Sequence, residues 1–377
     1  MKNNPIIKLQ TLGQSIWLDY IRRDLIVSGE LRRLIKEDGL RGMTSNPSIF
    51  EKAIADSHEY DNYIRSMVLE GKSVKTIYET LSQRDVQSAA DEFRPLYDKT
   101  EGVDGYVSLE VNPHLAHDTR GTMDEARRLW TMLDRPNVLI KVPATAEGLP
   151  VIQQLISEGI NVNVTLLFGI NRYRQVIEAY IAGIEARVTQ AKPVKNVASV
   201  ASFFISRIDA LVDPLLEKLF NKGGDDEDLA KTLHGQIAIA SAKVAYQVYK
   251  EIFHSDRFRK LADKGAATQR LLWASTSTKN PEYSDVKYIE SLIGRDTVNT
   301  VPTKTLDDYR DHGEPKNRIE DEVDKTRLML DRLPELGINI KSVTQKLEDE
   351  GVEKFSKSFD KLMDTLTQHH TDIHEKL

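Results

Sequence analysis

A lysine interrupts an apolar segment at residues 137–143, NVLIKVP, which otherwise has the composition of a buried strand. Burial of an ammonium group without a partner is unfavourable, so the charged form of Lys141 is disfavoured and a free amine becomes available. A neutral amine attacks carbonyl carbons and forms a Schiff base, whose iminium withdraws electrons and allows a nearby carbon–carbon bond to break. Lys141 is therefore the candidate nucleophile of a retro-aldol reaction.

Lys141 also has two structural explanations, and the sequence leaves both open. Its ammonium group could reach solvent past the end of the strand, with only its methylene groups buried. Alternatively, Glu110 or Asp19 could neutralise it in a buried ion pair.

Schiff-base chemistry needs acid/base groups and groups that hold the substrate. Asp19, in IWLDY, and Glu110, in VSLEVNP, supply two carboxylates from separate apolar segments. Asn46 and Asn163 can hydrogen-bond the hydroxyl groups of a polyol without adding charge.

Two cations follow later segments: Arg207, in ASFFISR, and Lys279, in WASTSTK, and both suit a phosphate dianion. Each polar residue taken singly has an ordinary structural explanation, such as an ion pair or a helix cap. Many segments nevertheless end in a polar residue, and a converging set indicates a binding site because buried polar groups are unfavourable unless matched. The remaining members of this set are Thr44, Thr165, Ser202 and Ser275. Together they predict a Schiff-base enzyme acting on a phosphorylated sugar.

The elements that must position these side chains alternate between short apolar segments and longer amphipathic ones. Several apolar segments lack polar alternation, as expected for parallel strands buried on both faces, and the segments between them have helical spacing. Such alternation over about eight units predicts an α/β fold of the (β/α)₈ TIM barrel class, in which functional residues lie at the carboxyl ends of the strands. The predicted strands are residues 15–20, 39–44, 104–111, 137–142, 161–168, 196–204, 270–276 and 297–302, and the predicted helices are 121–133, 147–159, 171–188 and 229–253.

A doubly wound open sheet is the alternative fold, but no glycine-rich dinucleotide motif follows an early strand. Residues 51–100 predict extra helices after the second strand, residues 222–230 an exposed acidic loop, and residues 341–377 a terminal amphipathic helix ending in a polar tail. We expect a single domain, 1–377.

The composition favours some classes of protein and excludes others. Hydrophobic residues make up 40% and charged residues 29% of the chain, which favours a folded globular protein over a disordered one. The net charge is −6 without any basic cluster, so we expect no nucleic-acid or membrane partner. The absence of cysteine excludes disulfides and thiolate chemistry. With no signal peptide and no membrane-length apolar segment evident, we expect a cytoplasmic protein.

A metal site is not expected, because the histidines form no helical metal-binding pair with a neighbouring glutamate. The tail HHTDIH, 369–374, is more simply a solvated terminal segment.

Several segments together resemble the transaldolase family: LGQSIWLDYI, GLRGMTSNPSIFEKAI, VSLEVNP, VLIKVPAT, NVNVTLLF, VASFFISRID, LLWASTSTKNPEYSD and DTVNTVP. The likeness extends from about residue 10 to the terminal helix. It is closest to the longer bacterial type, which also occurs fused to a glucose-6-phosphate isomerase domain. It implies a (β/α)₈ barrel that needs no cofactor and transfers a dihydroxyacetone unit between sugar phosphates in the pentose phosphate pathway.

The resemblance also implies roles for individual residues. Lys141 is similar to the Schiff-base lysine and Asp19 to the acid/base that cleaves the bond, while Glu110 and Thr165 match the pair that holds a catalytic water. The residues matching substrate contacts are Thr44, Asn46, Asn163, Ser202 and Phe204, with Arg207 matching the phosphate-binding arginine.

One position departs from the family pattern. Shorter members have a second phosphate-binding arginine after the seventh strand, where this chain has STSTK at 275–279. We assign that role to Lys279, assisted by Ser275.

Two other functions use the same residues. One is a related aldolase that releases free dihydroxyacetone, and the other is a sugar-phosphate-binding barrel without catalysis. The sequence does not choose between a monomer and a homodimer.

Overall fold

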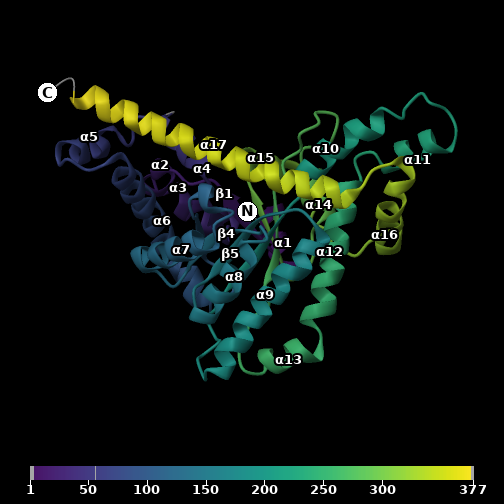
Figure 1. Cartoon of the computed structure of the whole chain (residues 1–377), viewed down its shortest axis with the longest axis horizontal. Helices are drawn as coiled ribbons and strands as arrows, with labels where there is room; N and C mark the ends of the chain where they lie inside the picture. Colours follow the sequence, from purple (N-terminus) through teal and green to yellow (C-terminus); the bar gives the residue numbers. More distant parts are fainter. Residues whose placement is uncertain (1–3, 56, 375–377) are drawn as a thin grey trace.

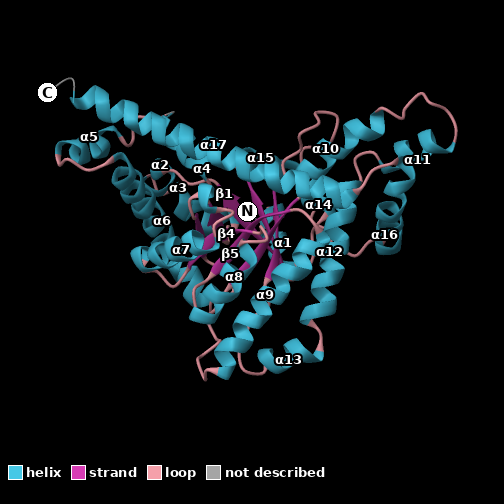
Figure 2. Ribbon diagram, viewed as in Figure 1, coloured by secondary structure: helices cyan, strands magenta, loops and turns pink. Residues whose placement is uncertain are grey.

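A closed barrel of eight parallel strands lies at the centre of the molecule. The computed structural model describes residues 4–55 and 57–374. Figure 2 shows the strands enclosed by helices. The strands are β1 (Gln14–Asp19), β2 (Gly42–Thr44), β3 (Tyr106–Glu110), β4 (Val138–Pro143), β5 (Val162–Leu167), β6 (Ser199–Phe204), β7 (Arg270–Ala274) and β8 (Thr297–Val301).

The pairing of β1 with β8 closes the sheet, and the predicted (β/α)₈ barrel is therefore confirmed. The doubly wound alternative is wrong, since an open sheet would leave those two strands unpaired. Burial explains the missing polar alternation: every residue of β4, β5 and β6 is buried. In such a strand one face packs against the outer helices and the other fills the barrel.

Helices surround the barrel and connect successive strands (Figure 1). Those before β4 are α1 (Pro5–Thr11), α2 (Arg23–Val27), α3 (Glu30–Arg33), η1 (Leu34–Asp38), α4 (Pro47–Ala55), α5 (Asp61–Leu69), α6 (Val74–Lys99), η2 (Pro113–Leu115) and α7 (Thr119–Leu133). Those between β4 and β7 are α8 (Gly148–Glu158), α9 (Ile170–Thr189), α10 (Ser206–Glu217), α11 (Asp225–Leu233), α12 (Ile237–Phe253) and α13 (Asp256–Ala262). The last are α14 (Lys287–Ser291), α15 (Thr303–His312), α16 (Val323–Arg332), η3 (Leu333–Leu336) and α17 (Ile340–His374).

The extra helices predicted after the second strand are present as α4, α5 and α6. The helices predicted at 121–133, 147–159 and 171–188 correspond to α7, α8 and α9, with shifts of only one or two residues at their ends.

The single helix predicted over residues 229–253 is wrong, because the chain breaks between α11 and α12. Gly235 has a φ of +69°, in the left-handed region that ends helices. Two carboxylates of α10 hold the break, with Asp213 accepting from the Gly235 N–H at 2.8 Å and Asp209 from the Ala238 N–H at 2.7 Å. The acidic loop predicted at 222–230 is also partly wrong: α11 begins at Asp225, where acidic side chains favour a helix N-terminus.

The terminal helix is confirmed as α17, which continues through the mostly polar segment 367–374, whereas residues 375–377 lie outside the described part. Figure 1 shows it crossing one end of the barrel. It contacts elements that follow strands: the Ser358 hydroxyl accepts from that of Ser48 at 2.7 Å, and Asp360 pairs with His114 at 2.6 Å. The end that α17 covers is therefore the carboxyl end of the strands.

The helix α10, which carries Arg207, is anchored by Asp209. This carboxylate also accepts from the Tyr288 hydroxyl at 2.8 Å. Burial, reinforced by the neighbouring charge of Asp213, raises the pKa of Asp209 to about 6.

Replacing Asp209 by asparagine is expected to reduce the dependence of stability on pH. Between about pH 4 and 6 the folded state keeps a proton on Asp209 that the unfolded state releases, so the free energy of unfolding decreases as pH rises. A difference of about two units between the folded and unfolded pKa of Asp209 corresponds to a change of roughly 3 kcal/mol in the free energy of unfolding. Urea unfolding of both proteins across this range measures the effect, with the exposed Asp226→Asn as control. Equal slopes for Asp209→Asn and the unmodified chain would contradict this account.

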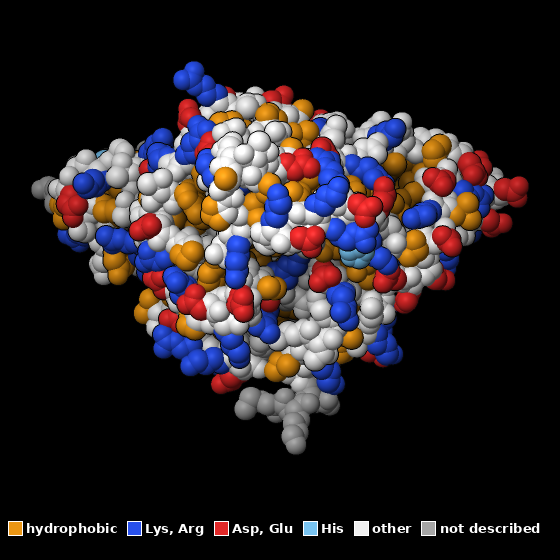
Figure 3. All heavy atoms as spheres, turned by 90° about the horizontal axis from the view of Figure 1, so that it is seen from below, with side chains coloured by type: hydrophobic (Ala, Val, Ile, Leu, Met, Phe, Trp, Pro, Cys, Tyr) orange, Lys and Arg blue, Asp and Glu red, His pale blue; other side chains and the backbone are white. Residues whose placement is uncertain are grey.

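Positive and negative side chains are interspersed over the face drawn in Figure 3. Within residues 4–55 and 57–374, no helix combines the length and apolar character needed to cross a membrane.

Candidate active site

Lys141 is buried inside the barrel, with only 4% of its surface exposed. Its Nζ donates to the carbonyl oxygen of Ser45 at 3.0 Å and lies 3.3 Å from Oε2 of Glu110. The side chain does not reach solvent past the strand end, so the first structural explanation is wrong. The second explanation, a buried pair with Glu110, describes the contact that is present.

The strand register places three of the predicted residues side by side. Glu110 of β3 is paired with Lys141 of β4, which is paired with Asn163 of β5. Neighbouring positions of parallel strands project to the same face, and all three side chains are buried. The barrel therefore brings an amine, a carboxyl and an amide together within one row.

Burial raises the pKa of Glu110, and the nearby Lys141 opposes that rise. Its carboxylate oxygens have no hydrogen-bond partner among the described residues, so the 3.3 Å contact is an ion pair without hydrogen-bond alignment. Burial favours the neutral form of the Glu110 carboxyl, so Glu110 can take up a proton and return it beside the Lys141 amine.

Asp19, at the end of β1, faces the same space from the other side. Its Oδ1 accepts a hydrogen bond of 2.7 Å from Thr44, whose hydroxyl also lies 2.7 Å from that of Thr300. Burial raises the pKa of Asp19, while Lys141, the Thr44 hydrogen bond, Arg207 and Lys279 each lower it. A carboxyl balanced in this way can both take up and return a proton.

Thr165 lies in an irregular part of β5. The register with β6 shifts between Val164 and Leu167, and Leu166 has a φ of +56°, which is unfavourable for a side chain of this kind. The Thr165 hydroxyl is buried and has no hydrogen-bond partner within the described part of the chain. It is therefore available to hold a water molecule near Glu110 and Lys141.

Asn163 belongs to a hydrogen-bonded network across the barrel. Its Nδ2 donates to the Ser108 hydroxyl at 3.0 Å, and its Oδ1 accepts from the Ser202 hydroxyl at 2.6 Å. The network fixes the orientation of the amide next to Lys141.

Asn46 acts as a helix cap in this structure. Its Oδ1 accepts from the Ile49 N–H at 3.1 Å, so the side chain caps α4, which starts at Pro47. Asn46 follows Ser45, whose carbonyl accepts from Lys141, and it lines a small cavity together with Glu110. Its predicted contact with substrate hydroxyls stays a prediction.

Arg207, in the first turn of α10, lies over the Phe204 ring, with 5.6 Å between its guanidinium carbon and the ring centroid. Phe204 in turn packs against Phe168, with 5.1 Å between centroids. Burial lowers the pKa of Arg207, although a guanidinium remains charged. The stack holds a cation at the carboxyl end of β6.

Ser275 and Lys279 follow β7 beside Arg207. Ser275 has a φ of +56°, and its carbonyl accepts from the Ser206 N–H and hydroxyl at 3.1 and 2.6 Å, which ties this turn to α10. Lys279 is exposed in part, and its ammonium donates to the Ser277 hydroxyl at 2.8 Å. Partial desolvation and the like charges of Arg207 and Lys354 lower the pKa of Lys279.

Sequence reasoning missed Lys354, a third cation in this group. Arg207, followed by partial desolvation, lowers the pKa of Lys354. On α17, Lys354 lies one turn after Gly351 and one turn before Ser358, which contacts Ser48. At Gly351 the helix approaches so closely that an added Cβ would lie 3.0 Å from Leu166. No motif marks Lys354, because only the path of α17 brings it to the barrel mouth.

The described part of the chain contains no group of three or more His, Cys, Asp or Glu side chains arranged to hold a metal ion.

Comparison with known proteins assigns the chain to a family. Residues 16–366 match the model of the family described as transaldolase/fructose-6-phosphate aldolase. The chain belongs to this family. Transaldolases of Trichodesmium erythraeum and Mycolicibacterium smegmatis are 48% and 45% identical to it, over 98% and 100% of both chains. A transaldolase 2 of a Nostoc species is 48% identical over 97% of both chains.

The agreement with these transaldolases covers the whole barrel and α17. The family resemblance read from the sequence segments is therefore confirmed, and it extends to the strands that carry Asp19, Glu110 and Lys141.

Proposed function

We propose that this chain is a transaldolase in which Lys141 forms a Schiff base with a ketose phosphate. The observation that carries the proposal is the buried Nζ of Lys141, held between the Ser45 carbonyl and the Glu110 carboxylate. The iminium itself is the electron sink, so this chemistry requires no cofactor.

In the first step the neutral Lys141 amine attacks the C2 carbonyl of a ketose such as fructose 6-phosphate. The carbinolamine then loses its hydroxyl as water, for which an acid must supply a proton. Glu110 provides that proton, because burial raises the pKa of its carboxyl. Thr165 orients the water, because its hydroxyl has no hydrogen-bond partner among the residues that the structure describes.

In the second step Asp19 takes the proton of the C4 hydroxyl, and the C3–C4 bond breaks. The electron pair passes into the iminium, which leaves an enamine of dihydroxyacetone on Lys141 and releases glyceraldehyde 3-phosphate. The Thr44 hydrogen bond fixes the carboxylate for this transfer.

In the third step the enamine attacks the aldehyde of erythrose 4-phosphate, Asp19 returns its proton, and hydrolysis of the new imine releases sedoheptulose 7-phosphate. All steps are reversible, as required in the non-oxidative pentose phosphate pathway. We further propose a single catalytic domain, 1–377, acting as a monomer or homodimer in the cytoplasm.

Borohydride trapping tests this function. Reduction of the enzyme in the presence of fructose 6-phosphate should add one reduced dihydroxyacetone unit to Lys141, located by peptide mass spectrometry. Modification of another lysine, or none under turnover conditions, would overturn the proposal. Release of free dihydroxyacetone without an aldehyde acceptor would identify the aldolase activity instead.

We assign the substrate phosphate to the cations at the mouth, Arg207, Lys279 and Lys354, with Ser275 assisting. Replacing Arg207 by alanine is therefore expected to raise KM for fructose 6-phosphate by about 10–100-fold, since a charge-assisted hydrogen bond contributes about 1.5–3 kcal/mol. The effect on kcat/KM for unphosphorylated fructose should be much smaller. Steady-state kinetics with both donors measure the difference, and exposed Arg94→Ala is the control. Equal losses for both donors would remove Arg207 from the phosphate site.

A further inference from the structure

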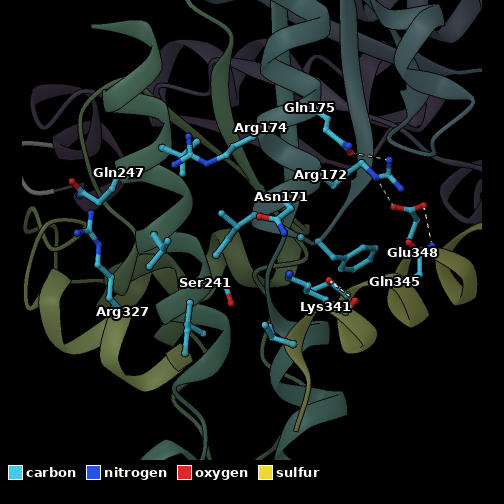
Figure 4. A pocket seen from close by; sticks show the side chains of 18 of the residues that line it. Asn171, Arg172, Arg174, Gln175, Ser241, Gln247, Arg327, Lys341, Gln345 and Glu348 are labelled. Atoms are coloured by element: carbon cyan, nitrogen blue, oxygen red, sulfur yellow. Dashed lines mark hydrogen bonds and ion pairs between the residues drawn. The ribbon is translucent and has the colours of Figure 1, made fainter. Parts of the chain in front are cut away.

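A second cavity lies outside the barrel mouth, between α9, α12, α16 and the start of α17 (Figure 4). Its volume is about 590 Å³, which is enough for a small metabolite. Neither Lys141 nor Arg207 lines it. The residue it shares with the mouth is Phe168, which packs on Phe204 beneath Arg207.

The N-terminus of α9 opens into this cavity. The N-cap residue is Gly169, which has no side chain to accept from the first N–H groups of the helix. Gly169, Ile170 and Asn171 line the cavity. Free N–H groups and the helix dipole at such an end favour an anion.

Ser241 of α12 provides an independent indication of a ligand. Its side chain is only 1% exposed, and its hydroxyl has no hydrogen-bond partner among the described residues. Figure 4 shows the hydroxyl oxygen directed into the cavity, with Asn171 and Lys341 across from it. The amide nitrogen of Gln247 also lacks a partner within the described part. Buried polar groups are normally paired, so these donors indicate a missing acceptor.

The charges around the cavity also favour an anion. Arg172 pairs with Glu348 at 3.3 Å, and Arg174 with Glu251 at 2.8 Å. Arg327 and Lys341 line the same space, and neither has a salt bridge within residues 4–55 and 57–374. One further carboxylate, that of Asp331, lines the cavity, so cationic side chains exceed anionic ones.

Apolar side chains complete the wall, namely Val244, Val248, Leu330 and Ile340. We propose that this cavity binds a phosphomonoester with a small apolar group, its phosphate at the α9 N-terminus and its apolar part against α12 and α16. Lys341 then neutralises the phosphate and the Ser241 hydroxyl donates to it. Arg327, which lies beside Gln247 at the opposite side of the cavity (Figure 4), adds positive charge to the wall.

Phenyl phosphate tests the site, because it has this chemistry and no carbonyl group for Lys141 to attack. Binding is measured by calorimetry in the Arg207→Ala protein, which weakens competition from the mouth. We expect the double substitution Arg327→Ala and Lys341→Ala in that background to raise Kd at least about 10-fold, from the loss of the charge-assisted contact of Lys341 and of the positive charge of Arg327. Ser241→Ala should raise Kd by about 5–10-fold for the loss of one hydrogen bond.

Matched lysines on the same two helices provide the control. Lys325 on α16 and Lys346 on α17 do not line the cavity, and they pair with Glu322 and Glu350. Replacing both by alanine removes the same charge and should leave Kd unchanged. No binding to the Arg207→Ala protein, or an equal loss in the control and cavity variants, would overturn the proposal. Borohydride trapping at Lys141 is independent of either result.

Discussion

Replacing Lys141 by methionine is expected to reduce transaldolase turnover by at least about 10⁴-fold, because it removes the covalent route altogether. Methionine has nearly the length of the lysine side chain and suits the apolar wall of β4, where Lys141 is 4% exposed. The barrel should remain folded. The substitution leaves Glu110 buried without a cation, but its raised pKa allows it to become neutral by binding a proton.

Fructose 6-phosphate turnover and thermal unfolding together measure this effect. A second buried lysine is the matched control: Lys243 of α12 is 7% exposed and donates to the Asp321 carbonyl at 2.8 Å, away from the barrel mouth. Lys243→Met should lower stability and leave kcat unchanged. A Lys141→Met enzyme with near-normal turnover would be incompatible with a Schiff base at this position.

The strands, and the polar residues Glu110, Lys141 and Asn163 that they carry, could be predicted because one physical constraint determines both. Strands buried on two faces must be apolar along their length, so an exception such as Lys141 or Glu110 stands out in the sequence. In a closed parallel barrel the strands also end at one mouth, so residues from distant segments meet there. The register between neighbouring strands is a consequence of barrel closure. It pairs Glu110 with Lys141, and Lys141 with Asn163.

Features that depend on the path of helices could not be predicted in this way. Lys354 has the same local pattern as any lysine on an amphipathic helix, and only the crossing of α17 over the mouth gives it a role. Asn46 is predicted to contact substrate because it is a polar residue that follows a strand, but its side chain also caps α4. The break between α11 and α12 depends on carboxylates from α10, which are remote in sequence.

Asp19→Asn is expected to lower kcat by about 10²–10⁴-fold, the usual contribution of a positioned acid/base. Asparagine keeps an oxygen that can accept the Thr44 hydrogen bond, so the geometry at the end of β1 should survive. The amide, however, cannot take the proton of the C4 hydroxyl. Formation of the imine uses Lys141 and Glu110, which are unchanged, so the Schiff base should still form while the C3–C4 bond no longer breaks efficiently.

Comparing borohydride trapping with turnover separates these two steps. In Asp19→Asn the reduced adduct on Lys141 should retain the whole six-carbon sugar phosphate, whereas the unmodified enzyme should yield mainly the three-carbon unit. The pH profile gives a second readout: burial raises the pKa of Asp19, so the acidic limb of kcat should lie above the range of an exposed aspartate and disappear in the variant. Asp24→Asn, an exposed position shortly after β1, is the control. If trapping and turnover decline together, Asp19 acts in forming the imine, and cleavage of the bond belongs to another residue.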